Sequence, residues 1–410
     1  MASFSALYRI EDIPQQRWQA LLAAAQPHHQ RLYYPFLDHR FLLALEQSGC
    51  IDSGHHDPLS HTPSGWLTHI LVSHDAAGEI DQVVPAFIKH HSYAEYVFDW
   101  SWAEAYQQHG LAYYPKLLLA APFTPATGPR LLGSANPDWS AITQLLADYC
   151  QQHRLSGWHL NFIEACHFQA LTQQREDAGT PEPLVHAAGR SACQFHWYNR
   201  GYQSFDHYLE YFSSRKRKSV RKERQKIAQQ GLTLVRKTAA DIQPGDIDVF
   251  YHCYQMTYAV RRSRGYLNRE FFHQLLASMP EQLMLVMAYA DDDAQHACAC
   301  ALYLFDDSTL YGRYWGALRE FDALHFEACY YQGIEFCIEQ NLQRFDPGTQ
   351  GEHKISRGFE PTLTYSVHQL MHPDFQRAVH HFVQQEQSHI LDYQQQARSL
   401  LPFKADQDES

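Results

Sequence analysis

The residues with the clearest chemical potential lie in one short segment near the end of the chain. Glu352, His353 and Lys354 are consecutive and follow Gly348 and Gly351. A histidine or a carboxylate can take the proton of an attacking amine, and a lysine can stabilise the oxyanion that forms during acyl transfer. We therefore expect His353 or Glu352 to act as the base and Lys354 as the electrostatic partner; the alternative is a solvated charged turn.

Arg313, Tyr314 and Trp315 form a second group, on an expected strand at residues 309–315. Alternation along a strand places Arg313 and Trp315 on one face and Tyr314 on the other. An arginine beside a tryptophan can hold a carboxylate or phosphate while the ring stacks on the ligand. We predict that the three residues bind substrate, against the alternative that they only pack an edge strand.

A helix is expected after this strand and the loop at 316–324, and His325 and Glu327 open it. His325 is a third candidate for acid–base chemistry. Glu327 has a simpler explanation, because a carboxylate in the first turn is stabilised by the helix dipole.

An earlier loop offers a second place for an anion. Thr124, Gly128 and Arg130 lie in a Pro-rich stretch before another expected helix. The glycine lets the backbone approach a ligand, the hydroxyl can donate, and the arginine carries charge, so a phosphate or carboxylate would fit. The alternative is a rigid turn.

One basic segment stands out in an acidic chain. The formal net charge is −12, yet residues 215–226 contain eight Lys/Arg and one acid, Glu223. Such density favours an anion nearby: tRNA, an anionic lipid headgroup, or an acidic surface of the same protein. The residues expected to contact a polyanion are Lys216, Arg217, Lys218, Arg221, Lys222 and Arg224.

Composition bounds the rest. A chain of 410 residues with 45% hydrophobic side chains is long enough for two domains. It has neither a run of about 20 apolar residues nor a signal peptide, so we expect a cytoplasmic protein. The nine cysteines form no C-x-x-C and the histidines show no zinc spacing, so we expect reduced thiols, no metal and no tightly bound cofactor.

The expected elements occur twice in the same order. Strands at 66–73 and 82–90, an apolar run at 116–123, a helix at 138–155 and a strand at 158–164 make the first unit. Strands at 283–290, 297–305 and 309–315, a helix at 326–341 and a strand at 343–346 make the second. Strands joined by tight turns are antiparallel, so the pattern predicts a duplicated α/β unit rather than a doubly wound sheet.

Several segments resemble the FemAB-like family of predicted N-acyltransferases in the GNAT superfamily. They are Tyr113–Leu117, Pro122–Pro125 with Gly128 and Arg130, Arg215–Lys218, Tyr311–Gly316 and Gln350–Ile355. The resemblance spans roughly residues 30–375. The chain contains no G-x-G, unlike the glycine-rich pyrophosphate loop typical of GNAT enzymes, and Fem-type transferases share this departure.

The resemblance implies two tandem GNAT-like units, each a mixed, mostly antiparallel sheet flanked by helices. We expect an N-terminal unit at 1–195, a catalytic unit at 196–385 and a helix end with a polar tail at 386–410. The implied activity is transfer of an acyl or aminoacyl group from acyl-CoA or aminoacyl-tRNA to an amine, with a cell-wall precursor as the implied acceptor. The rival is a noncatalytic module that recognises RNA or a peptidoglycan precursor.

Overall fold

The computed structural model describes residues 4–25, 33–54, 57, 62–173, 187–260, 262–349 and 351–404. The chain divides into two compact units. The first comprises residues 1–193 and 363–392, and the second comprises residues 194–362 and 393–410. The sequence predicts a division near residue 195, and the structure adds residues 363–392 to the first unit. No helix in the described ranges is both long and apolar enough to span a membrane.

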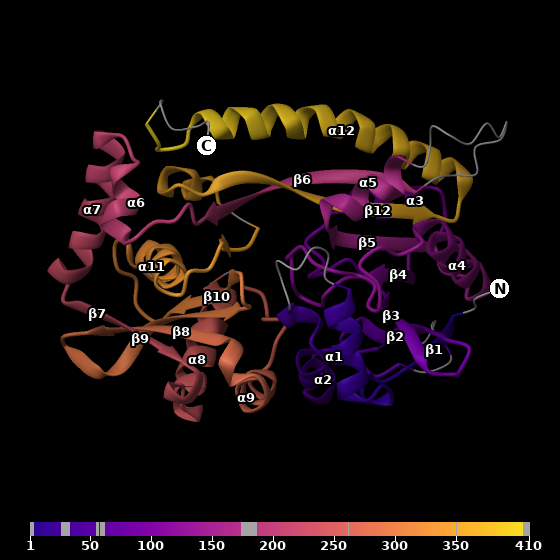
Figure 1. Ribbon diagram of the computed structural model, residues 1–410, viewed down its shortest axis with the longest axis horizontal. Helices are drawn as coiled ribbons and strands as arrows, with labels where there is room; N and C mark the ends of the chain where they lie inside the picture. Colours follow the sequence, from indigo (N-terminus) through magenta and orange to yellow (C-terminus); the bar gives the residue numbers. More distant parts are fainter. Residues whose placement is uncertain are drawn as a thin grey trace. The chain divides into compact units, whose positions relative to one another are not determined.

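The first unit is a mixed sheet flanked by helices (Figure 1). Its strands lie in the order β1 (Ser5–Leu7), β2 (Trp66–His74), β3 (Ile80–Lys89), β4 (Lys116–Leu119), β5 (Gly157–Ile163) and β12 (Glu360–Leu370). Among the described residues of these strands, β4 and β5 pair in parallel and the other neighbours pair antiparallel. The helices are α1 (Gln15–Ala24), α2 (His39–Gln47), α3 (Trp100–Gln108), α4 (Trp139–Gln152), α5 (Ala165–Gln173) and α12 (Pro373–Ser399).

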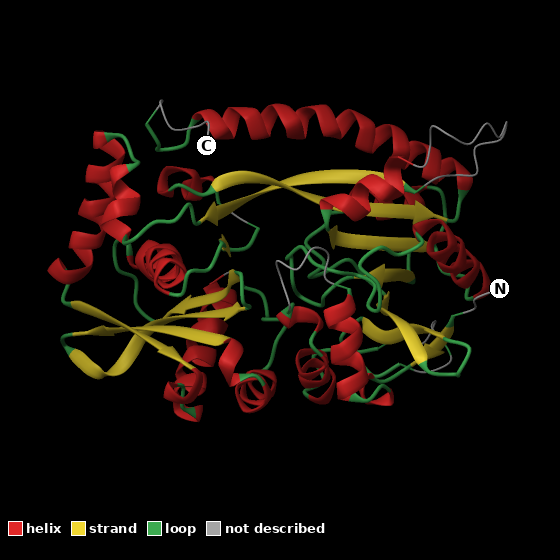
Figure 2. Ribbon diagram, in the orientation of Figure 1, coloured by secondary structure: helices red, strands yellow, loops and turns green. Residues whose placement is uncertain are grey.

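The second unit repeats this plan (Figure 2). Its strands lie in the order β6 (Ala188–Tyr198), β11 (Arg344–Asp346), β10 (Thr309–Ala317), β9 (Asp293–Phe305), β8 (Leu283–Ala290) and β7 (Leu232–Thr238). Where the structure describes these strands, β10 and β11 pair in parallel and the other neighbours pair antiparallel. Its helices include α6 (Phe205–Glu210), α7 (Ser214–Gln229), α8 (Pro244–Val260), α9 (Arg269–Ser278), α10 (Leu324–Phe326) and α11 (Gln332–Glu339).

The predicted α/β class, with a large mixed sheet flanked by helices, is confirmed. The strands expected at 283–290 and 309–315 are β8 and β10, with at most two residues of difference at one end. The helix expected at 326–341 is interrupted, because residues Glu327–Tyr331 form a π-helix, η6, between α10 and α11. Hydrophobic periodicity does not reveal this change of hydrogen-bond register.

Strands β10 and β11 pair over only a short stretch. They pair over Thr309–Tyr311 and Arg344–Asp346, after which β10 continues to Ala317 while β11 ends at Asp346. A β-bulge between Gly312 and Tyr314 adds one residue to β10 opposite β9. Bulges redirect side chains next to functional sites. The 3-10 helix η7 (Glu352–Arg357) follows β11 and carries the predicted catalytic residues.

The other side of β10 is closed by α8. A Cβ on Gly316 would lie 1.8 Å from the carbonyl oxygen of Cys253, so only glycine permits this approach of helix backbone to strand. Thr257 donates its hydroxyl to the carbonyl oxygen of Trp315 at 2.7 Å. These contacts hold β10 against α8. The side chain of Trp315 packs on the other side, against His325 of α10.

Candidate active site in the second unit

His353 lies at the centre of the cluster that the structure assembles. Its side chain is exposed on η7, and Nε2 lies 2.8 Å from the Tyr330 hydroxyl of η6. The ring of Phe326 lies 5.5 Å from the imidazole, centroid to centroid. Partial burial, followed by the charges of Arg357 and Lys354, lowers the pKa of His353. A neutral imidazole at neutral pH can accept a proton.

His325 joins His353 as the sequence predicts. The two imidazole centroids are 6.0 Å apart, and the Trp315 ring lies 5.5 Å from His325. Burial, followed by the charges around it, lowers the pKa of His325 to about 4. Three predicted site residues from β10, α10 and η7 therefore meet in one place.

Lys354 is buried, and Nζ donates to the carbonyl oxygen of Gly348 at 2.6 Å. The carbonyl oxygen of Pro347 lies 3.4 Å away. Burial lowers the pKa of Lys354 to about 8, although the charge of Asp346 opposes the shift. Its ammonium group therefore titrates close to neutral pH, which is unusual for a lysine.

Glu352 points elsewhere. It is exposed, and its carboxylate accepts a hydrogen bond from the Tyr393 hydroxyl of α12 at 2.8 Å. Gln350, which belongs to the predicted motif, lies outside the described residues. Gly351 has a φ of +106°, and a Cβ there would lie 2.2 Å from the imidazole of His353. The glycine therefore makes room for the ring.

The bulge changes what alternation predicts for β10. Tyr314 packs against Tyr254 of α8 and Phe272 of α9, with ring centroids 5.7 and 5.5 Å away. Arg313 is the added residue, and its guanidinium carbon lies 5.7 Å from the centroid of the neighbouring Tyr314 ring. Simple alternation therefore does not hold at Arg313, while Trp315 remains on the side of His325.

Sequence reasoning missed the supporting residues. Asp346 at the end of β11 is buried, accepts the backbone N–H of Gly348 at 2.9 Å and lies 3.6 Å from Nε2 of His196. Burial acts to raise the pKa of Asp346, but His196, Arg344 and that N–H together lower it. A buried aspartate at the end of a short strand gives no periodic signal, although its place two residues before Gly348 is typical of an Asx turn.

The predicted anion loop in the first unit is closed. Arg130 is buried and donates to three backbone carbonyl oxygens, those of Asn161, Pro129 and Ala126, at 2.7 to 2.8 Å. Thr124 donates to the carbonyl oxygen of Pro122 at 2.9 Å. Gly128 packs against Tyr34, whose ring a Cβ would meet at 2.6 Å. These hydrogen bonds occupy the donor groups that an anion would need.

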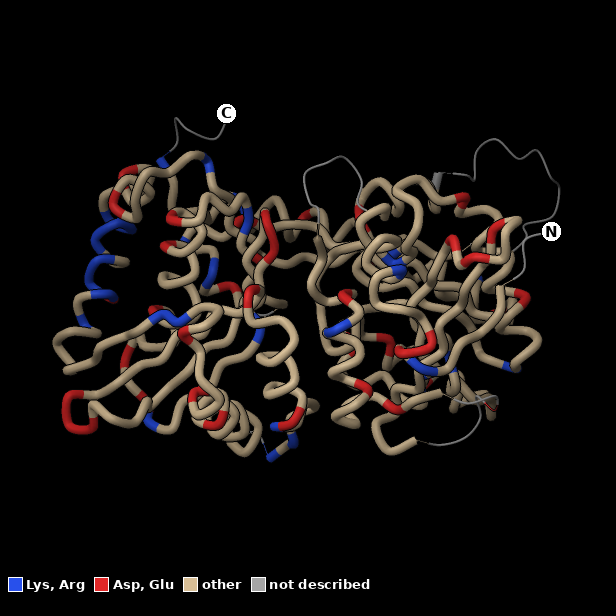
Figure 3. The backbone as a smooth tube through the Cα atoms, turned by 60° about the horizontal axis from the view of Figure 1, so that its bottom comes forward, with Lys and Arg blue, Asp and Glu red and all other residues tan. Residues whose placement is uncertain are grey.

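The basic segment forms α7, along which Lys and Arg gather in Figure 3. Three of its cations have acidic partners: Arg221 pairs with Asp206, Arg224 with Glu327 and Glu335, and Lys226 with Asp322. In the described part of the chain, no ion pair involves Arg215, Lys216, Arg217, Lys218 or Lys222. The protein's own acids therefore neutralise only part of the helix.

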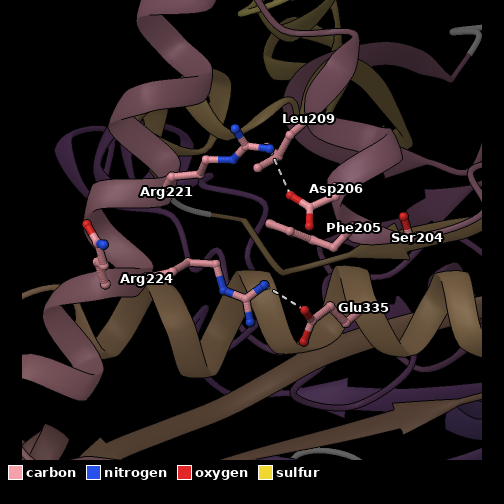
Figure 4. Close-up of a pocket in the computed structure, with 8 residues that line it drawn as sticks. Ser204, Phe205, Asp206, Leu209, Arg221, Arg224 and Glu335 are labelled. Carbon is pink, nitrogen blue, oxygen red and sulfur yellow. Dashed lines mark hydrogen bonds and ion pairs between the residues drawn. The ribbon is translucent and has the colours of Figure 1, made fainter.

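An open pocket of about 690 Å³ lies beside α7 (Figure 4). Arg221 and Arg224 enter it from α7, Asp206 from α6 and Glu335 from α11. The lining is completed by Ser204, Phe205, Leu209 and Gln225. Because both arginines already pair with carboxylates, the pocket offers little free positive charge, and the unpaired cations lie elsewhere on the helix.

The structure also contains one group of close metal-ligand donors among the described residues. Donor atoms of Glu164, Cys166 and His167 lie within 4.8 Å of one another at the start of α5. This group is in the first unit and shares no residue with the His353 cluster. The absence of a metal stays a prediction from the sequence, and elemental analysis of the purified protein tests it.

Solved structures that resemble this chain share little of its sequence. A conserved protein of unknown function from Bacteroides thetaiotaomicron has a TM-score of 0.51 and 11% identity, covering 90% of this chain and 100% of that one. FemX has a TM-score of 0.49 and 12% identity, and the match covers 92% of this chain and 100% of FemX. The C-terminal domain of a putative lysylphosphatidylglycerol synthetase from Agrobacterium fabrum has a TM-score of 0.49 and 10% identity, covering 89% and 94%.

A search of curated protein sequences gives no match. The family model FemAB-like, described as peptidoglycan biosynthesis/recognition, matches residues 9–405. That range includes most of both compact units, with β10, η7 and α7. The chain therefore belongs to the FemAB-like family.

Proposed function

We propose that this protein is an N-acyltransferase that moves an acyl or aminoacyl group onto an amine. The observation that carries the proposal is the hydrogen bond between Tyr330 and His353, which lies on η7 next to the buried Lys354. Membership of the FemAB-like family supports an acceptor related to peptidoglycan.

The chemistry assigned to His353 requires one tautomer. When Nε2–H donates to the Tyr330 hydroxyl, Nδ1 keeps a free lone pair and can take the amine proton. The amine nitrogen then bonds to the carbonyl carbon, and the C–S or C–O bond to the donor breaks. The leaving thiolate or alkoxide takes up the proton from the imidazolium, so His353 returns to its starting state.

Lys354 supplies positive charge to the same region. Its Nζ bonds only to backbone carbonyl oxygens among the described residues, so no carboxylate cancels its charge at hydrogen-bond distance. A developing oxyanion would be stabilised by such a buried cation. Tyr330 holds the imidazole, and Trp315 with His325 forms the wall beside it.

The unpaired cations of α7 bring in a second component of the function. Five lysines and arginines without acidic partners in the described chain suit a polyanion, and both donor classes carry phosphates. We assign tRNA or an anionic lipid surface to α7 as its partner, in agreement with the charge pattern. The donor itself is acyl-CoA or aminoacyl-tRNA.

The test begins with the small molecules that the purified protein retains, identified by mass spectrometry. Candidate donors, acyl-CoA and aminoacyl-tRNA, are then incubated with amine acceptors, including peptidoglycan precursors, and the acylated product is measured. We expect product with the wild-type protein and its loss in His353→Ala. Binding of donor and acceptor without any turnover would instead favour a recognition module.

A further inference from the structure

Glu223 is the single acid in the basic segment, and it faces the candidate site. Its two carboxylate oxygens each lie 2.9 Å from Nη2 of Arg357, and the Tyr331 hydroxyl of η6 donates to the same carboxylate. Its neighbours Lys218 and Lys222 are exposed, whereas Glu223 is only partly exposed. The helix therefore presents cations to solvent and this anion to the protein.

Arg357 connects that carboxylate to His353. Its guanidinium donates through Nη1 to the carbonyl oxygen of His353 at 2.6 Å. The guanidinium carbon lies 3.5 Å from the centroid of the Phe326 ring, on which the imidazole also packs. Arg357 thus holds both the backbone of His353 and the ring beside its side chain.

The next residue of α7 holds the other half of the site. Arg224 donates to Glu327 of η6 at 2.9 and 3.1 Å and to Glu335 of α11 at 2.6 Å. The π-helix that begins with Glu327 carries Tyr330, the partner of His353. Glu223 and Arg224 therefore connect α7 to both segments that meet in the hydrogen bond between His353 and Tyr330.

The energetics make the Glu223–Arg357 pair difficult to lose. The Arg357 side chain is 6% exposed and that of Glu223 is 23% exposed. Removing one partner of a largely buried pair leaves the other charge uncompensated, which costs more than the pair contributes when intact. The carboxylate therefore keeps the guanidinium in the orientation that reaches the carbonyl oxygen of His353.

We propose that Glu223 and Arg357 form a positioning pair that holds His353 in the acyl-transfer site, so that the basic helix α7 is part of the framework of that site. This inference rests on the proposed function for the role of His353. It does not depend on which donor or acceptor the enzyme uses. Neither residue of the pair is assigned a contact with substrate.

Titration of His353 reports on the pair without any substrate. The groups that face the imidazole are Arg357 and Lys354 on η7, His325 on α10 and the neutral Tyr330 on η6, and Glu223 faces Arg357 from α7. Glu223→Gln releases the guanidinium that lowers the pKa of His353, so that pKa should rise. Arg357→Gln removes a positive charge, so the pKa should rise.

The experiment follows the ring signals of labelled histidine by NMR in the full chain across a pH series. The signal of His353 is identified by its absence in His353→Ala. We expect a higher pKa of His353 in Glu223→Gln and in Arg357→Gln, and a value close to wild type in Glu223→Asp and in the control Lys222→Gln. A lower pKa of His353 in Glu223→Gln, or no change there, would show that Arg357 keeps its place without Glu223 and would overturn the proposal.

Thermal unfolding of each variant separates positioning from folding. If Arg357→Gln fails to fold, the contrast between Glu223→Gln and Glu223→Asp still decides the question. With substrate in hand, Glu223→Gln should lower kcat by about 10- to 100-fold with little change in KM. A wild-type protein without turnover refutes the proposed function but not the pair, whereas full turnover with an unchanged pKa in Glu223→Gln refutes the pair alone.

Discussion

Each compact unit of the protein buries a lysine within a polar cluster, and the two clusters are built differently. Lys116 in β4 donates to Glu95 at 2.8 Å, to Ser92 at 2.9 Å and to Asp99. Burial alone would lower its pKa, yet the two carboxylates raise it. Tyr113 donates to the same Asp99, and this cluster is buried throughout.

Lys354 in the second unit has backbone carbonyl oxygens in place of carboxylates, and burial lowers its pKa to about 8. Its neighbour His353 is exposed. The contrast shows that the partners of a buried lysine decide its role. Two carboxylates fix the charge of Lys116 and suit it to holding the fold, whereas Lys354 can change its charge and lies next to a side chain that solvent reaches.

The strongest test of this contrast is His353→Ala. If the second cluster performs the chemistry, turnover should fall by about 10²- to 10⁴-fold, because the amine loses its general base. The free energy of unfolding should change little, since the side chain is exposed. Steady-state kinetics and denaturant unfolding measure the two effects. His389→Ala, at an exposed position of α12, is the control.

A His353→Ala protein that folds and keeps full activity would remove His353 from the mechanism. The proton would then pass to Glu352 or His325. The pH–rate profile distinguishes them, because a limb at about 4 to 5 indicates a carboxylate and one at about 6 to 7 an ordinary histidine. The low pKa of His325, about 4, brings its limb close to that of the carboxylate, so His325→Ala completes the test.

Lys116→Met should have the opposite effect. Two buried carboxylates, Glu95 and Asp99, would lose their cation, and we expect the free energy of unfolding to fall by about 3 to 5 kcal/mol. Molecules that remain folded should keep their turnover rate. Denaturant unfolding with turnover measured per folded molecule gives both numbers. A stable Lys116→Met protein that has lost turnover would place chemistry in the first unit. It would refute the purely structural role of the Lys116 cluster.

Lys354→Met tests whether the charge of Lys354, unlike that of Lys116, controls the pH dependence of turnover. In the wild type, a rate that depends on the ammonium charge should fall as pH rises through about 8, the folded-state pKa. That limb should disappear in Lys354→Met. The folded pKa lies below the unfolded value of 10.5, so the folded state binds fewer protons between these values. The free energy of unfolding of the wild type, relative to Lys354→Met, should therefore rise from pH 8 to 10.5.

The smallest expected effect concerns α7. Replacing Lys216, Arg217 and Lys218 with Gln should weaken binding of tRNA or anionic vesicles and reduce the slope of log affinity against log salt by about one unit per lost phosphate contact. Arg221→Gln should matter less, because Asp206 already pairs with Arg221. Fluorescence anisotropy across a salt series measures both. Equal slopes in the wild type and the triple variant would exclude this part of α7 from the contact.

The sequence predicted the parts of the site that follow strand order. The strand at 309–315, the helix after it and the charged segment after the next strand bring Trp315, His325 and His353 together, as a duplicated α/β unit requires. Local pattern was enough because each residue lies at the end of an element that hydrophobic periodicity locates. The loop with Thr124 and Arg130 looked equally suitable, but only the structure shows its groups bonded to backbone carbonyls.

The supporting residues were beyond such reasoning. Glu223 and Arg357 are 134 positions apart in the sequence, and no local pattern in either segment predicts that the two residues meet. Glu95 and Asp99 lie in an aromatic stretch without helix or strand periodicity, so their ion pairs with Lys116 could not be predicted from the sequence. The bulge at Arg313 and the π-helix each depend on one extra residue, which a period of 2 or 3.6 does not detect.

The extra residue in η6 also fixes the length of the chain between β10 and β11. Arg224 forms ion pairs with Glu327, the first residue of η6, and with Glu335 of α11. Gly333 of α11 packs so tightly on Phe345 that a Cβ would lie 2.5 Å from the ring. Deleting one residue from Glu327–Tyr331 would restore an ordinary helix but rotate α11 by about 100° relative to α10. Either the ion pairs of Arg224 or the contact of Gly333 with Phe345 would then be lost. This segment should therefore tolerate substitutions in its sequence far better than any change in its length.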